Sequence, residues 1–394
     1  MFDKTFSRRQ FAKSCLLAAA AAPLSQTEVL SKMISKPQYG GPNVIIIRYG
    51  GGVRRQETII TEKTHSPYMM KVLADKATLF SNMEISNMQD IETSHAQGTA
   101  YIITGRYHAY ENLSNKPVGE ILQPNVPTLF EYFRKHYDIG VRETLIINGE
   151  NRLEDESLNF GTHHMFGVQY RSEILSYNKF KAYLYQTKLE EGGMDEKQEA
   201  QIRKELDEML QKSLELVDPK KYPKRIQKFW NKWRDFYGDT GLLNPRGDRL
   251  STEISLWAMK HLRPKLMMIN YQDPDYVHWG IKSQYTRGIS IIDHGIRQIV
   301  NAVENDDFYR DNTVFVIVPD CGRDSNPLMD IPYQHHFNTQ SSREIFAMMF
   351  GTGIQKGRVI DKTVDQISIT KTIGEIMGFK TSEAEGELLR EAFI

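Results

Sequence analysis

Two loops of this chain combine carboxylates with imidazoles or a thiol, and each loop follows a short apolar run. The first follows the run 265–269 and places Asp273, Asp275 and His278 within six residues. Oxygen and nitrogen donors spaced this closely are ligands for divalent metals such as zinc, manganese or calcium. Because the apolar run has the composition of a buried strand, the loop lies at a strand end, and we interpret it as part of a metal site.

The second loop follows the apolar run 313–318 and begins with Asp320 and Cys321, while His335 and His336 come shortly afterwards. Each of these side chains is a candidate metal ligand. A thiolate is as good a zinc ligand as an imidazole, although Cys321 is equally well read as a small buried hydrophobic residue. Function therefore depends on whether the two loops meet in the folded protein.

Three further polar side chains are candidates for the chemistry itself. Arg323 would either pair locally with Asp324 or bind an anionic substrate oxygen through parallel hydrogen bonds. Ser94 and His95 lie in a loop that leads into a predicted helix. We therefore place Ser94, His95 and Arg323 in the candidate catalytic set.

These loops can converge only on a suitable scaffold. The β-branched run Asn43 to Ile47 is continuous and ends at three glycines, Gly50 to Gly52, which is typical of a buried parallel strand. Further strands are predicted at 143–148, 265–270, 313–318 and 344–350, in alternation with helices. This alternation predicts an α/β fold with a mainly parallel sheet covered on both faces. Ligands in such folds bind at the carboxyl ends of the strands, where all these loops would lie.

Residues 172–248 interrupt the alternation. They are charged and amphipathic, with Leu206, Met209, Leu210, Leu214 and Val217 on one face, and they include Trp230 and Trp233. The apolar repeat is not sustained, which argues against a coiled coil. We interpret this stretch as a helical insertion within one domain.

The charge balance of the chain limits the class of partner. Lys and Arg together number 50, and so do Asp and Glu. The sequence therefore offers no global electrostatic attraction for nucleic acid or for an anionic membrane surface. Partners must be inferred from local sites.

The amino terminus has the layout of an export signal. Ser7-Arg8-Arg9-Gln10-Phe11-Ala12-Lys13 precedes the apolar run 15–23, which is shorter than the roughly 20 residues that a membrane-spanning helix needs. The motif resembles a twin-arginine signal. It predicts a signal peptide at 1–26, a mature domain at 27–394, the twin-arginine export machinery as a partner, no transmembrane segment, and a periplasmic or extracellular location. Cys15 lies inside the signal, so Cys321 would be the only mature cysteine and no intramolecular disulfide is expected.

The order of these segments resembles the alkaline phosphatase superfamily, most nearly its exported sulfatase-like and phosphodiesterase-like members. The resemblance rests on six segments, which are 43–47, Thr104-Gly105, the Asp/His loop before Trp279-Gly280, 285–303, 313–322 and 349–378. It implies a three-layer α/β/α sandwich with a mainly parallel central sheet and a helical insertion. It also implies one or two divalent metal ions and the hydrolysis of a small anionic ester, a phosphate or sulfate ester or a glycan.

The metal pattern of the superfamily is only half matched. Its middle-loop Asp and His share one ion with its last His, and these match Asp275 (or Asp273), His278 and His336 (or His335). The second ion of the superfamily is held by an Asp after the first strand, the nucleophile and a later Asp-His pair. Here Gly50 to Gly52 follow the first strand, and the later pair is Asp320-Cys321. The second half of the site therefore departs from the pattern.

The nucleophile position is also altered. Counting back about nine residues from the Thr-Gly pair reaches His95, with Ser94 one residue away. Neither Ser94 nor Cys321 has the Cys/Ser-x-Pro/Ala-x-Arg context of a sulfatase nucleophile. A metal or His95 must activate Ser94, or else a water molecule activated by the metal attacks.

Two hypotheses about function follow from the half-matched pattern. The first is an exported metal-dependent hydrolase of a phosphate or sulfate ester. The alternative is a catalytically inactive superfamily member that binds an anion, a glycan or a protein.

Overall fold

The computed structural model describes residues 36–114, 120–149, 156–212, 218–239, 247–278, 280–336 and 338–394. The predicted signal peptide at 1–26 lies outside the described residues, as do Leu214, Val217 and Trp279. Among the helices in the described ranges, none has both the length and the hydropathy needed to cross a membrane.

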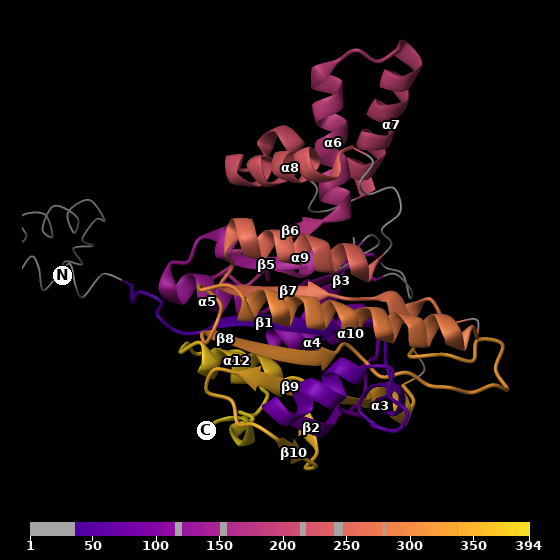
Figure 1. The fold of residues 1–394 in the computed structure, drawn as a ribbon, viewed down its shortest axis with the longest axis vertical. Coiled ribbons are helices and arrows are strands. Elements are labelled where there is room, and N and C mark those ends of the chain that lie inside the picture. The colour runs from indigo at the N-terminus through magenta and orange to yellow at the C-terminus, as the bar shows by residue number, and fades with distance from the viewer. Residues whose placement is uncertain are drawn as a thin grey trace, which may run out of the picture.

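A nine-stranded sheet forms the centre of the described structure (Figure 1). Its order is β10-β2-β9-β8-β1-β7-β5-β6, and β11 pairs with β2. The strands are β1 (Asn43–Tyr49), β2 (Ala77–Glu84), β5 (Thr144–Asn148), β6 (Glu173–Ser176), β7 (Leu266–Asn270), β8 (Thr313–Pro319), β9 (Glu344–Gly351), β10 (Arg358–Ile360) and β11 (Val364–Asp365). Pairing is parallel except that β9 runs antiparallel to both β2 and β8. A separate hairpin pairs β3 (Tyr110–Asn112) with β4 (Leu122–Pro124).

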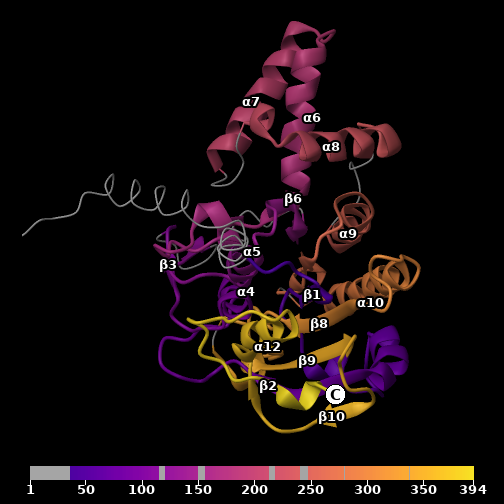
Figure 2. The same cartoon turned by 90° about the vertical axis from the view of Figure 1, so that its left-hand side faces the viewer.

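Helices cover both faces of this sheet, as the two perpendicular views show (Figures 1 and 2). The helices are α3 (Arg55–Thr58), α4 (His95–Thr104), α5 (Leu129–Tyr137), α6 (Tyr177–Glu191), α7 (Glu196–Lys212), α8 (Lys224–Tyr237), α9 (Asp248–Leu262), α10 (Lys282–Glu304), α11 (Gln340–Arg343) and α12 (Ser368–Ile376). Helices α9 and α10 pack on one face, and α4, α5 and α12 pack on the other. The predicted α/β/α sandwich with a mainly parallel sheet is confirmed.

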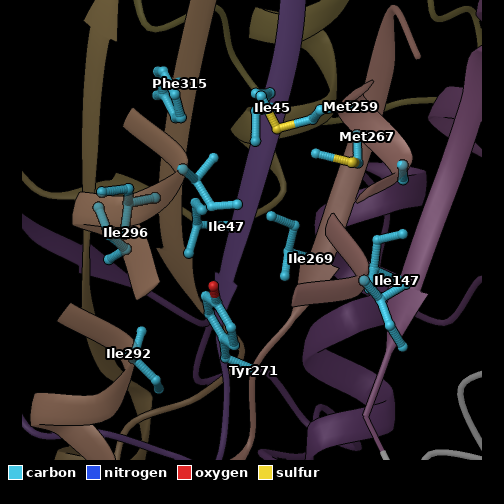
Figure 3. Close-up of a cluster of buried hydrophobic side chains, with 14 of the residues drawn as sticks. Ile45, Ile47, Ile147, Met259, Met267, Ile269, Tyr271, Ile292, Ile296 and Phe315 are labelled. Carbon is cyan, nitrogen blue, oxygen red and sulfur yellow. The ribbon is translucent and has the colours of Figure 1, made fainter. Parts of the chain in front are cut away.

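Strand β1 shows why the apolar runs are continuous rather than alternating. Ile45 and Ile47 point toward α9 and α10, in the cluster drawn in Figure 3. Val44 and Ile46 point to the opposite face and pack with α4, α5 and α12. A strand that is buried on both faces needs an apolar side chain at every position.

Helix α5 shows how a local motif fixes the start of a helix. It begins at Leu129, and Thr128 is its N-cap. The Glu131 carboxylate accepts a hydrogen bond from the Thr128 backbone nitrogen at 2.7 Å, and the Thr128 hydroxyl accepts one from the Glu131 nitrogen. This reciprocal capping box fixes the start of the helix and leaves Pro127 outside it.

Between β6 and α9 the described residues form helices α6 to α8, which project from one edge of the domain (Figure 1). The aromatic side chains of α8 attach them to the domain, since the ring of Trp233 meets that of Trp257 in α9 at a centroid distance of 5.7 Å. Trp230 and Trp233 are buried against Phe180 of α6, within the same apolar cluster that contains α9 and α10.

Candidate metal centre

Strand order brings the two loops of interest together. Strand β1 lies between β8 and β7 and is parallel to both. The carboxyl ends of these three strands therefore lie side by side, and the loops after Tyr49, Asn270 and Pro319 meet at one edge of the sheet.

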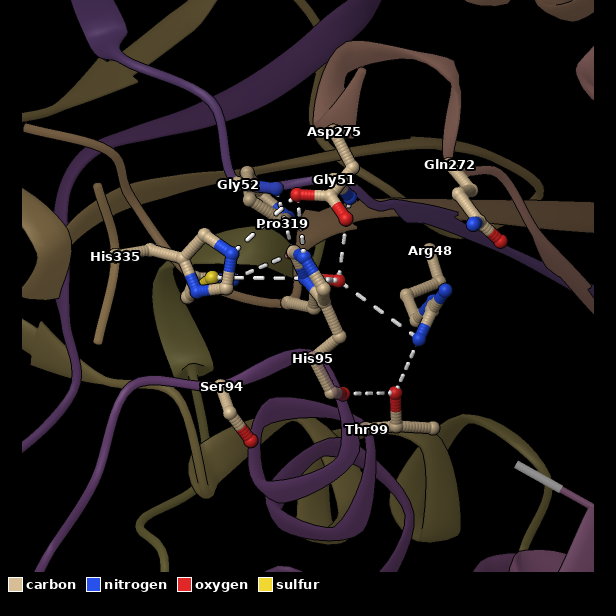
Figure 4. A network of polar contacts seen from close by, with 12 residues as sticks. Arg48, Gly51, Gly52, Ser94, His95, Thr99, Gln272, Asp275, Pro319 and His335 are labelled. Atoms are coloured by element: carbon tan, nitrogen blue, oxygen red, sulfur yellow. Dashed lines mark hydrogen bonds and ion pairs between the residues drawn. The ribbon is translucent and has the colours of Figure 1, made fainter. Parts of the chain in front are cut away.

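The Asp275 carboxylate is the centre of the site (Figure 4). It lies at the end of the short 3-10 turn η7 (Asp273–Asp275). Four nitrogens surround its Oδ1 atom, namely His95 Nε2 at 3.0 Å, His278 Nε2 at 3.0 Å, His335 Nε2 at 3.3 Å and Arg323 Nη2 at 2.7 Å. Although burial acts to raise the pKa of Asp275, the charge of the neighbouring His95 and the hydrogen bond from His278 hold it well below its usual range. This carboxylate is therefore ionised at neutral pH.

Asp320 forms the second acidic group, and its carboxylate is fully buried. Its oxygens accept hydrogen bonds from the backbone nitrogens of Cys321 at 2.8 Å, Gly52 at 3.2 Å and Gly51 at 3.3 Å. His95 Nδ1 lies 2.8 Å from Asp320 Oδ2, so the His95 ring bridges the two carboxylates of the site. Burial acts to lower the pKa of His95, but Asp275 and Asp320 outweigh burial and raise it well above its ordinary value.

The adjacent histidines His335 and His336 both lie at the centre of the site. His335 is buried, and its Nδ1 lies 3.1 Å from the Thr93 backbone oxygen, to which it can only donate. Its Nε2 is therefore the nitrogen with the free lone pair. Nitrogens of His278, His335 and His336 lie within 4.8 Å of one another. Burial lowers the pKa of His336 to about 4 and that of His335 well below its usual value, so both imidazoles are neutral at pH 7.

The two nucleophile candidates differ in direction. Ser94 is the N-cap of α4, and its hydroxyl accepts a hydrogen bond from the Gln97 nitrogen at 3.3 Å. In Figure 4 its side chain points away from Asp275, whereas His95, one residue later, points into the centre. The structure therefore brings His95 to the site and commits Ser94 to capping the helix.

Helix α4 approaches Asp320 closely because residue 98 is a glycine. A Cβ atom on Gly98 would lie 1.9 Å from the Asp320 backbone oxygen. Any side chain at position 98 would separate the helix from the loop. Gly98 thus allows α4 to present His95 to both carboxylates.

Arg323 does not face a substrate space in this structure. Its side chain is fully buried, and its Nε donates to the Gly52 oxygen at 2.8 Å and its Nη1 to the Tyr333 oxygen at 3.0 Å. The guanidinium pairs with Asp275 and not with Asp324, the neighbouring acid that the sequence suggests as its local partner.

Arg48 is a site residue that sequence reasoning missed. It is fully buried near the end of β1, with Nη1 at 3.7 Å from Asp320 Oδ2 and Nη2 donating to the Tyr271 oxygen at 3.2 Å. A signal for it existed in the sequence. An arginine inside a β-branched buried strand needs a buried acid as its partner, because an unpaired buried charge is too costly.

Cys321 is fully buried, with its Sγ 3.8 Å from His95 Nδ1. Burial and the nearby Asp320 raise the pKa of the Cys321 thiol to about 11. The thiol is therefore protonated and sheltered at pH 8.

We expect iodoacetamide to modify native Cys321 very slowly at pH 8 and rapidly once the protein is unfolded in guanidinium, because the thiolate is the reactive form. Mass spectrometry of the peptide that contains Cys321 measures both rates. Equal rates in the native and unfolded protein would contradict the burial of this thiol.

No protein-family model and no curated protein sequence matches this chain. Several solved structures match it in fold. The wild-type alkaline phosphatase PafA aligns with a TM-score of 0.55 at 9% identity, over 91% of this chain and 100% of that one. The 2-O GAG sulfatase BT1596 aligns with a TM-score of 0.52 at 14% identity, over 89% and 73% of the two chains. A protein in the alkaline phosphatase superfamily from Vibrio parahaemolyticus aligns with a TM-score of 0.51 at 13% identity, over 91% and 73%.

These matches define the fold of the chain. The chain has the fold of the alkaline phosphatase superfamily, and the resemblance drawn from its sequence is confirmed at that level. At identities of 9–14%, the matches establish the fold alone.

Proposed function

We propose that this protein is a metal-dependent hydrolase of anionic esters, and of phosphate esters in the first place. The single observation that carries the proposal is the convergence of three histidine nitrogens and Arg323 on one oxygen of Asp275. We favour phosphate esters over sulfate esters as the substrate because the chain lacks the sequence context of a sulfatase nucleophile.

The residues present fit a divalent metal. Neutral imidazoles and an ionised carboxylate are the donor set of zinc and manganese sites, and His278, His335, His336 and Asp275 supply it. A metal bound by this set would polarise an ester oxygen and lower the pKa of a water molecule.

The chain's own residues would orient the substrate. His95 stands at the first position of α4, where the backbone N–H groups and the helix dipole favour an anion. Its proton on Nδ1 is held by Asp320, which fixes the ring orientation. Because the Ser94 hydroxyl caps the helix, we propose water rather than Ser94 as the attacking group.

The second candidate function is an inactive member that binds an anion, a glycan or a protein. One observation favours it, since Asp275 is paired with Arg323 and Asp320 with Arg48, so that both carboxylates are already neutralised by fixed cations. In that case the site would bind an anion without hydrolysing it.

We further propose that the twin-arginine segment at 1–26 directs export of the folded protein, and that the mature domain acts in the periplasm or outside the cell. The substrate would then be a small anionic ester or a glycan ester of that compartment. The three helices α6 to α8 are proposed to be the helical insertion of this single domain.

We expect His278→Ala to lose the bound metal and to lower hydrolysis of a phosphate ester by about 100-fold or more, because a metal supplies about 3 kcal/mol or more of charge stabilisation. Metal content by mass spectrometry and rates on a panel of phosphate monoesters, phosphate diesters and sulfate esters measure the two effects. His294→Ala, on the exposed face of α10, is the matched control and should change neither. A folded wild-type protein that contains no metal and hydrolyses none of the esters would favour the second candidate function, an inactive member that only binds its ligand.

A further inference from the structure

We infer that this centre binds one metal ion per chain, at Asp275, His278, His335 and His336, and that the Asp320 half binds none. The inference rests on the proposed function and sharpens it, because it states how many ions the hydrolase uses and excludes Asp320 and Cys321 as ligands. Four features of the described residues carry it.

The first feature is the environment of Asp320. Its Oδ1 accepts hydrogen bonds from the Cys321 and Gly52 nitrogens, and its Oδ2 accepts from the Gly51 nitrogen and faces His95 Nδ1 at 2.8 Å. These donors already occupy the lone pairs of both oxygens. A metal at Asp320 would have to displace backbone amides that belong to the turn itself.

The second feature is charge. Asp275 and Asp320 carry two negative charges, and Arg323 and Arg48 beside them carry two positive charges. Because Arg48 and Asp320 are fully buried, an additional divalent ion next to them would place uncompensated positive charge in a low-dielectric region. The guanidinium of Arg48 thus takes the electrostatic place of a second ion.

The third feature is His335, which two candidate ligand sets share. The first set is His278 with His335 and His336, and the second is His95 with Cys321 and His335. Since His335 Nδ1 donates to the Thr93 oxygen, only Nε2 has a lone pair for a metal. One lone pair binds one ion, so the two sets exclude each other.

The turn after β1 leaves no room for the acid that the second half would need. A Cβ atom on Gly50 would lie 1.8 Å from the Tyr271 oxygen, and one on Gly51 would lie 2.7 Å from the Asp275 nitrogen. Gly51 also has a φ of +83°, which side-chain-bearing residues rarely adopt. The backbone of the Asp275 loop fills the space where a carboxylate would project.

Two measurements on the untagged full chain test the inference. Metal analysis after dialysis against a small excess of zinc should give one ion per chain. The cobalt-substituted protein should show no thiolate-to-cobalt charge-transfer band, and Cys321→Ser should keep the same stoichiometry and spectrum. His335→Ala should lose the ion, with circular dichroism to verify its fold.

The outcomes separate the inference from the proposed function. Two ions per chain, or a charge-transfer band that Cys321→Ser removes, would overturn the single-ion inference and leave a metal-dependent hydrolase intact. No bound ion together with no ester hydrolysis would overturn both. If His335→Ala does not fold, the wild-type stoichiometry and the cobalt spectra still decide.

Discussion

Asp275→Asn is expected to abolish metal binding and to lower the free energy of unfolding by about 3–5 kcal/mol, the typical cost of removing one partner of a buried ion pair. The reason is Arg323, whose guanidinium is fully buried and pairs with Asp275 Oδ1 at 2.7 Å. Asparagine offers this guanidinium a neutral amide oxygen in place of a carboxylate, so its buried charge loses its ionic partner. Chemical denaturation and metal analysis measure the two losses.

Asp330→Asn is the control for Asp275→Asn and should keep both metal binding and stability, because Asp330 is an exposed acid in the loop that follows Arg323. Adding Arg323→Met to Asp275→Asn removes both charges together and is expected to restore much of the stability without restoring metal binding. A double variant no more stable than Asp275→Asn alone would show that the pair is not the source of the effect.

Gly98→Ala is expected to destabilise the protein by about 1–3 kcal/mol, although alanine is the better helix former by about 1 kcal/mol. The added methyl group would lie 1.9 Å from the Asp320 oxygen, and a backbone atom cannot rotate away. Helix α4 must therefore shift, and His95 moves away from both carboxylates. Metal affinity and hydrolysis should fall with the stability.

Gly140→Ala is a matched control for this change. A Cβ atom on Gly140 would meet only the Glu143 carboxylate at 3.7 Å, which is an ordinary contact. Thermal unfolding and hydrolysis rates of the two variants should differ clearly. A Gly98→Ala protein as stable and active as Gly140→Ala would mean that α4 does not need its close approach to Asp320.

The scaffold was predictable because its signals are local. Continuous apolar runs ending in glycine or acidic loops indicated β1, β7 and β8, and the structure confirms all three strands. The antiparallel direction of β9 was not predictable, since a buried apolar strand looks the same in either direction.

The candidate site was predictable only in part. Asp275, His278, Asp320, Cys321, His335 and His336 all lie at the edge where the sequence placed them, and counting back from Thr104-Gly105 reached His95. The sequence could not predict which of Ser94 and His95 faces the site. The two residues are adjacent, and only the position at which α4 starts decides which side chain points inward. The pairs Arg48–Asp320 and Arg323–Asp275 depend on strand order, which sequence periodicity does not specify.

The residues that form the candidate metal centre are far apart in the sequence, and this separation determines at which stage of folding a metal ion could bind. Asp320 is separated from His95 by 225 residues, and His335 from Thr93 by 242 residues, so the pocket exists only after the long loops between them have closed. A nascent or unfolded chain therefore offers no preformed site, and the metal of the proposed hydrolase would be acquired only after folding. If the twin-arginine segment exports the folded protein, the cytoplasm would supply that ion, and its free metal concentrations would decide which ion the mature protein carries.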